Sequence, residues 1–274
     1  MLRYLIVASL LVAAPGVAQD TPGPAVSLTR LDCGRAPEPW PLNSFDDTGA
    51  AAEETKALVG SCYLIRHGDR ALVWDTGIDP STSGDPDGGF ILDSTLVSQL
   101  AKLGLSPADI DFVGISHYHY DHVGQAKDFP ASTLLIGKAD WEAITRDPPL
   151  GNADPKMFAP WIAGSSTVET FTGDKDVFGD RSVVILSMPG HTPGHHALLV
   201  RLAGMGPVLL TGDLAHFAEN YAREGVPTFN TDRADTLASF DRFKKIAKTI
   251  GATVIIQHEP GDVAKLPAFP EAAQ

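Results

Sequence analysis

Ser116-His-Tyr-His-Tyr-Asp-His-Val-Gly124 is the most informative stretch of this sequence. It follows the apolar run Phe112–Ile115, which reads as a strand. Four potential metal ligands lie within six of its residues, and they are His117, His119, Asp121 and His122. Imidazole and carboxylate are donors that zinc accepts. A polar loop with chance histidines is the alternative, but the whole chain has nine histidines, so three in this window argue against it.

Three further apolar runs also lead into a histidine or an aspartate. They are Val183–Leu186 before His191, Val208–Leu210 before Asp213, and Thr253–Gln257 before His258. Because side chains beyond the carboxyl ends of neighbouring strands converge in an open sheet, we expect these ligands to meet the first four. Five histidines and two aspartates are enough for two metal ions with coordination positions left open.

These motifs resemble those of the metallo-β-lactamase superfamily. His117–His122 matches its HxHxDH signature, Gly190–His195 its GHTPGH turn, and Trp74–Gly77 its early DTG turn. Thr211–Asp213 and His258 complete the set, and the similarity spans roughly residues 60–260. The resemblance implies an α/β fold, an αββα sandwich in which two mixed β-sheets face each other with helices outside.

The resemblance also implies a role for each ligand. His117, His119 and His191 bind one metal ion, Asp121, His122 and His258 bind the second, and Asp213 bridges both. Two divalent metal ions are therefore the expected cofactor, with zinc as the expected metal. Asp75 is predicted to orient a ligand imidazole, with an ordinary turn residue as the alternative. His195 is predicted to support its turn rather than to bind metal.

Within the superfamily, the spacing is most similar to the N-acyl-homoserine lactonase group. The resemblance implies a binuclear-metal hydrolase that opens a cyclic ester by attack of a metal-bridging hydroxide, with an N-acyl-homoserine lactone, a quorum signal, as substrate. Asp121 is expected to help deliver the proton to the leaving alkoxide. Many such lactonases have a tyrosine three residues after the bridging aspartate, where this chain has His216. Either His216 takes over the polar contact with the substrate, or the substrate differs.

Two aromatic residues that follow His216, Phe217 and Tyr221, are candidates to line the substrate pocket, with ordinary packing as the alternative. Two interpretations are also open for a group of apolar residues, which form either a lid over an acyl chain or a loop packed on the core. These residues are Trp141, Met157, Phe158 and Trp161.

Other functions remain open at this point. A β-lactamase would suit an exported protein, although the bridging Asp213 argues against it. A glyoxalase II-like thioesterase is a further alternative, but the short segment after His258 is expected to leave no room for a glutathione-binding domain. A metal-binding module without turnover is disfavoured by the complete ligand set. The net charge of −13 argues against a nucleic-acid partner.

The first 18 residues read as a signal peptide, with a basic start at Arg3, an apolar run over 4–14, and cleavage after Ala18. That run is shorter than the ~20 residues of a membrane span, so a periplasmic or secreted protein without a membrane anchor is expected. Residues 19–60 are predicted to form an arm that leads into the hydrolase domain, residues 61–274. Cys33 and Cys62 form either a disulfide or two buried thiols. The sequence leaves the oligomeric state open.

The remaining pattern is an alternation of strands and helices. Strands are expected at 62–66, 71–74, 112–115, 133–136, 183–186, 197–200, 208–210 and 253–257. Helices are expected over 96–103 with Ser94 as cap, over 139–145, and from a cap at Thr231 or Asp232 to Ile250. His67, in the turn of the first hairpin, is expected to face solvent.

Overall fold

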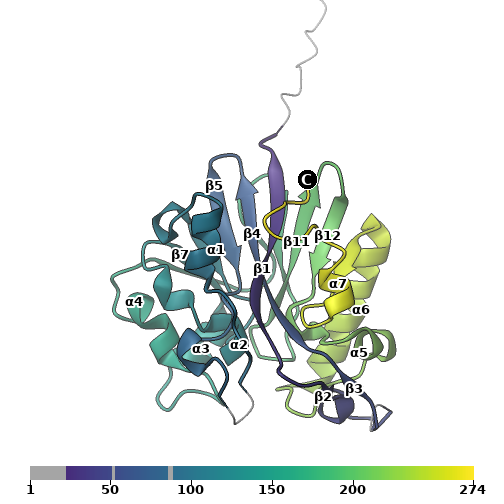
Figure 1. Cartoon of the computed structure of the whole chain (residues 1–274). Coiled ribbons are helices and arrows are strands. Elements are labelled where there is room, and N and C mark those ends of the chain that lie inside the picture. Colours follow the sequence, from purple (N-terminus) through teal and green to yellow (C-terminus); the bar gives the residue numbers. More distant parts are fainter. Residues whose placement is uncertain (1–22, 51–52, 86–88) are drawn as a thin grey trace, which may run out of the picture.

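The computed structural model describes residues 23–50, 53–85 and 89–274. The predicted signal peptide and its cleavage site therefore lie outside the described residues. Two β-sheets face each other, with α1 to α4 outside the first sheet and α5 and α6 outside the second, while α7 lies beside the edge strands β1 and β13 (Figure 1). This arrangement confirms the predicted sandwich.

The strands are β1 (Val26–Arg35), β2 (Trp40–Pro41), β3 (Thr55–Lys56), β4 (Val59–His67), β5 (Arg70–Trp74), β6 (Phe112–Gly114), β7 (Thr133–Gly137), β8 (Val168–Phe171), β9 (Lys175–Asp176), β10 (Val183–Ser187), β11 (His196–Leu202), β12 (Gly206–Leu210) and β13 (Thr253–Ile255). The α-helices are α1 (Leu96–Lys102), α2 (Tyr120–Val123), α3 (Lys138–Thr145), α4 (Ala159–Ile162), α5 (Ala218–Arg223), α6 (Arg233–Ile250) and α7 (Pro260–Val263). Thr95 rather than Ser94 caps α1, while Asp232 caps α6 and Gly251 ends it, as predicted.

Both sheets are mixed. The first has the strand order β1-β4-β5-β6-β7-β8, antiparallel from β1 to β5 and parallel from β5 to β8. The second has the order β13-β12-β11-β10-β9, in which only β12 and β13 are parallel. A small third sheet pairs β2 with β3.

Alternation along the strands explains the layers. In β4, Tyr63 and Ile65 point between the two sheets, whereas Leu64 points outward to the core beneath α1. In β11, Leu198 faces the first sheet and Leu199 packs under α6. Successive side chains of a strand point to opposite faces of the sheet. Because consecutive residues of these strands are apolar, both faces of each sheet have to be buried.

The predicted N-terminal arm differs from the structure. Residues 26–35 form β1, which pairs along β4 from Val26 opposite His67 to Arg35 opposite Val59. A disulfide between Cys33 and Cys62 joins the same two strands. Within the described arm, β1 thus belongs to the first sheet and β2 and β3 form the small third sheet, and residue 61 lies inside a strand rather than at a boundary. Polar residues alternate with apolar ones in β1, which is typical of a half-buried strand, but the prediction for residues 19–60 relied on composition instead.

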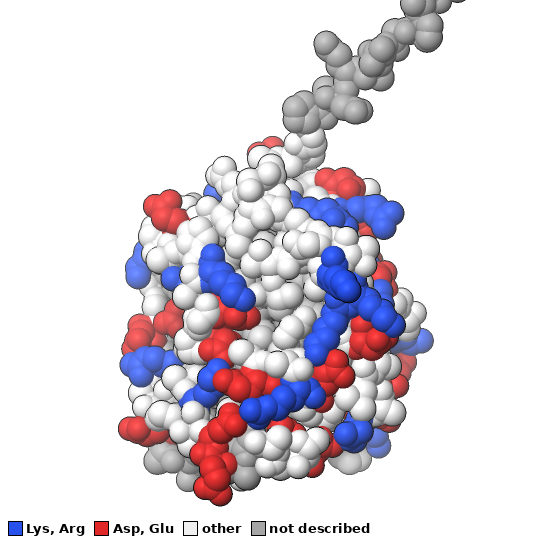
Figure 2. All heavy atoms as spheres, turned by 90° about the vertical axis from the view of Figure 1, so that its right-hand side faces the viewer, with Lys and Arg blue, Asp and Glu red and all other residues white. Residues whose placement is uncertain are grey.

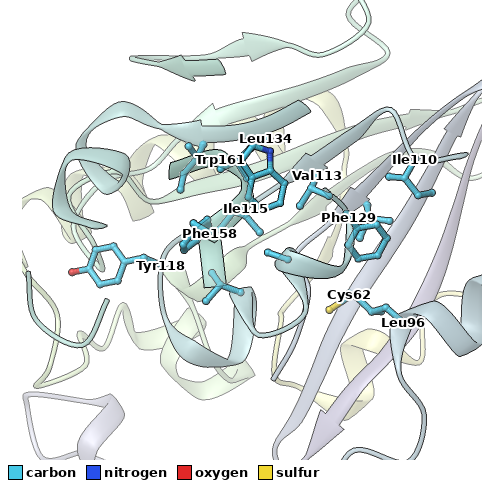
Figure 3. Packing of buried hydrophobic residues seen from close by; sticks show 14 of the residues in the cluster. Cys62, Leu96, Ile110, Val113, Ile115, Tyr118, Phe129, Leu134, Phe158 and Trp161 are labelled. Atoms are coloured by element: carbon cyan, nitrogen blue, oxygen red, sulfur yellow. The ribbon is translucent and has the colours of Figure 1, made fainter. Parts of the chain in front are cut away.

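Phe158 and Trp161 of the segment 147–166 pack on the core, while Gly151 and Asn152 of the same segment line the cavity described below. Phe158 and Trp161 are buried beside Ile115 and Leu134 (Figure 3). The indole of Trp161 donates a hydrogen bond to the carbonyl of Ser132. The alternative of ordinary packing is therefore correct for these two aromatic residues.

The expectation that His67 faces solvent is wrong. Its ring is buried, stacked on Phe178 at 4.3 Å between centroids, and its Nε2 lies 2.7 Å from an oxygen of Asp180. A turn position predicted exposure, but Phe178 and Asp180, from the bend between β9 and β10, cover the ring.

Basic and acidic side chains are interleaved on the face shown in Figure 2. Among the described residues, no helix is long and apolar enough to cross a membrane.

Candidate metal centre

The predicted ligands come from four loops at one end of the sandwich, close to α2 in Figure 1. After β6 the chain makes a loop in which His119 precedes α2, a helix of only four residues. The loops after β10, β12 and β13 bring His191, Asp213 and His258 to the same place. The structure thus brings together side chains that are far apart in the sequence.

Three imidazoles and one carboxylate oxygen form what we call the first ligand cluster: His117, His119, His191 and Oδ2 of Asp213. The Nε2 atoms of His117 and His191 each lie 2.9 Å from Nδ1 of His119. Oδ2 of Asp213 lies 3.6 Å from Nε2 of His117 and 3.4 Å from Nε2 of His191.

The second ligand cluster consists of Asp121, His122, His258 and Oδ1 of Asp213. Oδ2 of Asp121 lies 3.7 Å from Nε2 of both His122 and His258. Oδ1 of Asp213 lies 3.2 Å from Nε2 of His122 and 2.9 Å from Nε2 of His258. Asp213 therefore turns one oxygen to each cluster, as a bridging ligand would.

These residues fit divalent cations. Nε2 of His122 is buried without a hydrogen bond, although it faces Asp213. In the first cluster, two ring nitrogens converge on a third, so hydrogen bonds between them cannot use every lone pair. A buried nitrogen without a partner is costly, and a cation bound by nitrogen and oxygen donors removes that cost.

Burial and charge set the protonation of the two clusters differently. Burial lowers the pKa of His117 and His191 well below the ordinary value and lowers the pKa of His119 to about 4. Burial alone would also lower the pKa of His122 and His258, but the nearby carboxylates of Asp213 and Asp121 raise it in both. The first cluster therefore presents neutral imidazoles, the form that binds metal.

Most of the ligand imidazoles are oriented through their outer nitrogen. Asp75 is fully buried, and its Oδ2 accepts a hydrogen bond from Nδ1 of His122 at 3.0 Å while Oδ1 accepts one from the amide of Ser116 at 2.7 Å. This is the contact that the sequence predicted for Asp75. Its backbone φ of 57° is a strained conformation for a non-glycine residue and is typical of functional sites.

Two further contacts hold ligands from outside. Nδ1 of His191 donates to Oδ1 of Asn230 at 2.7 Å, and Nδ1 of His258 donates to the carbonyl of Val59 at 2.8 Å. Such outer partners fix the ring and leave Nε2 for a metal. The sequence reasoning missed Asn230, which has no signal of its own beyond its place before the cap of α6.

His195 lies behind the clusters. Its Nε2 accepts a hydrogen bond from the backbone amide of Asp213 at 2.9 Å, and its Nδ1 donates to the carbonyl of Met188 at 2.9 Å. Both ring nitrogens are thus used within the protein, and His195 holds Asp213 in place.

Of the three predicted substrate residues, only His216 reaches the cavity. Phe217 is fully buried, with its ring edge against Phe45 at 5.2 Å, so it supports the cavity wall from behind. Tyr221 lies on α5 and packs against Phe240 of α6. Closeness to Asp213 in the sequence is misleading for both, because the chain turns away from the site as α5 begins.

His216 lies at the edge of both clusters. Its Nε2 is 3.0 Å from Oδ2 of Asp213, its ring is stacked on that of His258, and its Nδ1 is buried without a hydrogen bond. With Asp213 and His258 it forms a third group that could hold a cation. The geometry thus suits either contact with a substrate or metal binding.

The cavity next to the clusters has a volume of about 460 Å³. Aromatic rings form much of its wall, and they belong to Trp40, Phe45, Phe90, Tyr120 and Phe229. No lysine or arginine of the described chain lines it. Sequence reasoning missed this wall, because two of its rings lie in the segment predicted as an arm.

Comparisons with known proteins show the family of the chain. A family model described as Metallo-beta-lactamase superfamily matches residues 55–258. The chain is 31% identical over 226 residues to the N-acyl homoserine lactonase AttM of Rhizobium johnstonii, an alignment that covers 76% of this chain and 85% of the relative.

Two solved structures share the fold. A quorum-quenching N-acyl homoserine lactone hydrolase superposes with a TM-score of 0.77 at 24% identity, over 91% of this chain and 99% of that chain. AidC, described as a dizinc quorum-quenching lactonase in complex with its product N-hexanoyl-L-homoserine, superposes with a TM-score of 0.65 at 20% identity, over 92% and 91% of the two chains.

Proposed function

Because the chain belongs to the metallo-beta-lactamase superfamily, we propose that it is a metal-dependent hydrolase that opens N-acyl homoserine lactones. The observation that carries the proposal is the convergence of seven His and Asp side chains into two clusters that share Asp213 beside an aromatic cavity. The relative AttM, which bears the name of such a lactonase, supports the substrate class.

The proposed cofactor is a pair of zinc ions, one in each ligand cluster. Two such ions lower the pKa of bound water towards about 7 and polarise a carbonyl oxygen, which is the chemistry that ester hydrolysis needs. AidC, a dizinc lactonase of the same fold, supports the number and the kind of metal.

The residues of the chain supply position and proton transfer. Asp121 borders the cavity, and its side chain keeps 13% of its surface exposed, so it can take a proton from the attacking water and pass it to the alkoxide that forms when the ester C–O bond of the ring breaks. His216 borders the same cavity from the opposite loop and can hydrogen-bond the substrate carbonyl. Asp213 and the histidines of the two ligand clusters would hold the two metal ions in a fixed position beside the cavity.

The cavity wall favours a neutral substrate with an apolar substituent. Aromatic rings exclude water from an acyl chain, and no described cation lines the cavity to pair with a carboxylate or a phosphate. Homoserine lactones with acyl chains meet both conditions. Glutathione thioesters and most β-lactams carry carboxylates, so this wall argues against the two alternative activities.

The test is a side-by-side assay of the purified protein with zinc. A panel of N-acyl homoserine lactones, a chromogenic β-lactam and a glutathione thioester are compared by kcat/KM. We expect the lactones to be hydrolysed at least 100-fold more efficiently than the other two. Higher efficiency with the β-lactam or the thioester would overturn the proposal.

We also propose that the protein is exported and acts in the periplasm or outside the cell. The signal-like residues 1–18 support this, as does the Cys33–Cys62 disulfide, since disulfides persist in oxidising compartments. Sequencing the N-terminus of the protein from a periplasmic fraction tests it, and the expected first residue is Gln19. Recovery of the uncleaved chain from the cytoplasm would contradict export.

A further inference from the structure

Asp140 is a buried carboxylate to which the proposed mechanism gives no task. It lies in the first turn of α3, fully buried, and belongs to neither ligand cluster. Burial of a carboxylate in this position is unfavourable and raises its pKa to about 7. A residue that keeps such a group needs contacts that make up for the cost.

The contacts of Asp140 reach two different loops of the metal centre. Its Oδ2 accepts a hydrogen bond from Oγ1 of Thr192 at 2.7 Å, and its Oδ1 accepts one from the amide of Gly194 at 2.6 Å. The backbone of Tyr118 also interacts with this carboxylate and lowers its pKa. Thr192 follows the ligand His191, and Tyr118 lies between the ligands His117 and His119.

A single carboxylate therefore joins the two loops that supply all three imidazoles of the first ligand cluster. The packing is close, because a side chain at Gly194 would collide with Asp140. The second ligand cluster has no such connection to Asp140, and there Asp75 performs the comparable task by holding His122 and Ser116.

A second link joins the same loops on another side. The backbone amide of His196 donates to the carbonyl of Ser116 at 2.9 Å, and the amide and Oγ1 of Thr231 both donate to the carbonyl of His191 at 3.1 Å. With this link in place, loss of the Asp140 contacts is expected to shift the two loops relative to each other rather than to unfold the domain.

We propose that Asp140 is a positioning residue that sets the spacing between the two loops of the first ligand cluster, and that the metal affinity of this cluster depends on it. The proposal rests on the proposed metal centre and adds to it a site-specific dependence on a residue outside both clusters. Partners that orient metal ligands typically contribute 10–100-fold to metal affinity.

The experiment measures Co²⁺ affinity of each cluster separately, by competition with a chromophoric chelator. His258→Ala leaves the first cluster as the intact one, and His119→Ala leaves the second. Asp140→Asn is introduced into both backgrounds, because the amide has nearly the same shape but turns a donor towards the donors of Gly194 or Thr192. Asp75→Asn is the matched variant for the second cluster.

We expect Asp140→Asn to weaken Co²⁺ binding about 10–100-fold in the first cluster and less than about threefold in the second. Asp75→Asn should show the reverse. Gln99→Leu is the control for a general loss of stability, because Gln99 is a buried amide that bonds Asp32 and Ser94 away from the clusters. It should leave both affinities unchanged.

Equal weakening of both clusters, or no weakening of the first, would overturn the inference. If Asp140→Asn does not fold, Thr192→Val, which removes one of the two hydrogen-bond donors to Asp140, takes its place with the same expected selectivity. If the unchanged protein binds no Co²⁺, the proposed metal centre itself is refuted. Failure of the proposed function can therefore be distinguished from failure of the inference about Asp140.

Discussion

Replacement of His216 by phenylalanine separates a contact with the substrate from a metal ligand. The phenyl ring keeps the packing of the imidazole against Phe45, at 4.7 Å, and the stack on His258, at 5.5 Å between centroids. It removes the Nε2 atom that lies 3.0 Å from Asp213, and it removes a buried Nδ1 that has no hydrogen bond. Folding should therefore be unharmed.

If His216 hydrogen-bonds the substrate, its loss should lower kcat/KM about 100-fold, which corresponds to about 2.7 kcal/mol of transition-state stabilisation. Two metal ions should remain bound, because the seven other donors are untouched. His216→Tyr restores a donor and should recover part of the loss. The assay combines lactone kinetics with metal analysis of the same samples.

Two results would refute this reasoning. A kcat/KM within about threefold of the unchanged protein would show that His216 makes no contact that matters to the reaction. Loss of a metal ion in His216→Phe would show that His216 is a ligand, as its grouping with Asp213 and His258 allows.

Three further predictions concern the cavity, the pH dependence and the disulfide. Phe229 is 48% exposed at the cavity, so Phe229→Ala should leave the melting temperature nearly unchanged. It should lower kcat/KM for N-decanoyl homoserine lactone more than for N-butanoyl homoserine lactone, and equal effects on both substrates would contradict a contact between Phe229 and the acyl chain. Because the pKa values of His122 and His258 are raised, protons compete with metal at the second cluster, and acidification from pH 8 to 5.5 should release metal from it first. Metal analysis of the single-cluster variants follows this release, and earlier loss of metal from the first cluster would contradict the order. The disulfide closes a loop of 29 residues, so the double change of Cys33 and Cys62 to serine should lower the free energy of unfolding by about 3 kcal/mol in urea titrations, and an unchanged value would refute that role.

The convergence of the candidate ligands could be predicted because their pattern is local. Each follows an apolar run, and strands of that kind end at one edge of a sheet, so the convergence of His117 with Asp213 follows from the order of elements alone. The sandwich could be predicted for the same reason, together with the resemblance of the motifs to one superfamily.

The residues that hold the ligands could be predicted only in part. Asp75 lies in a recognisable turn, but Asp140 and Asn230 act through contacts with residues 52 and 39 positions away in the sequence. Nothing in their local sequence distinguishes them from solvent-facing polar residues. Asp140 joins the two loops because it is buried between them, and the burial of a single residue cannot be read from its local sequence.

The substrate wall shows the opposite error. Phe217 and Tyr221 are near Asp213 in the sequence but point into the packed interior, whereas Trp40 and Phe45 come from the segment that the composition marks as an arm. Proline and aspartate in residues 19–60 predict an irregular segment. Tertiary packing overrides that local preference, because Phe45 lies in the turn Leu42–Phe45 and packs against His216 and Phe217 at the cavity.

The most direct test of the metal centre is anomalous diffraction at the zinc edge from crystals of the protein grown with zinc. We expect two peaks per chain, one among His117, His119 and His191 and the other among Asp121, His122 and His258, with Asp213 in contact with both ions. A single peak, or peaks bound by other residues, would contradict the account.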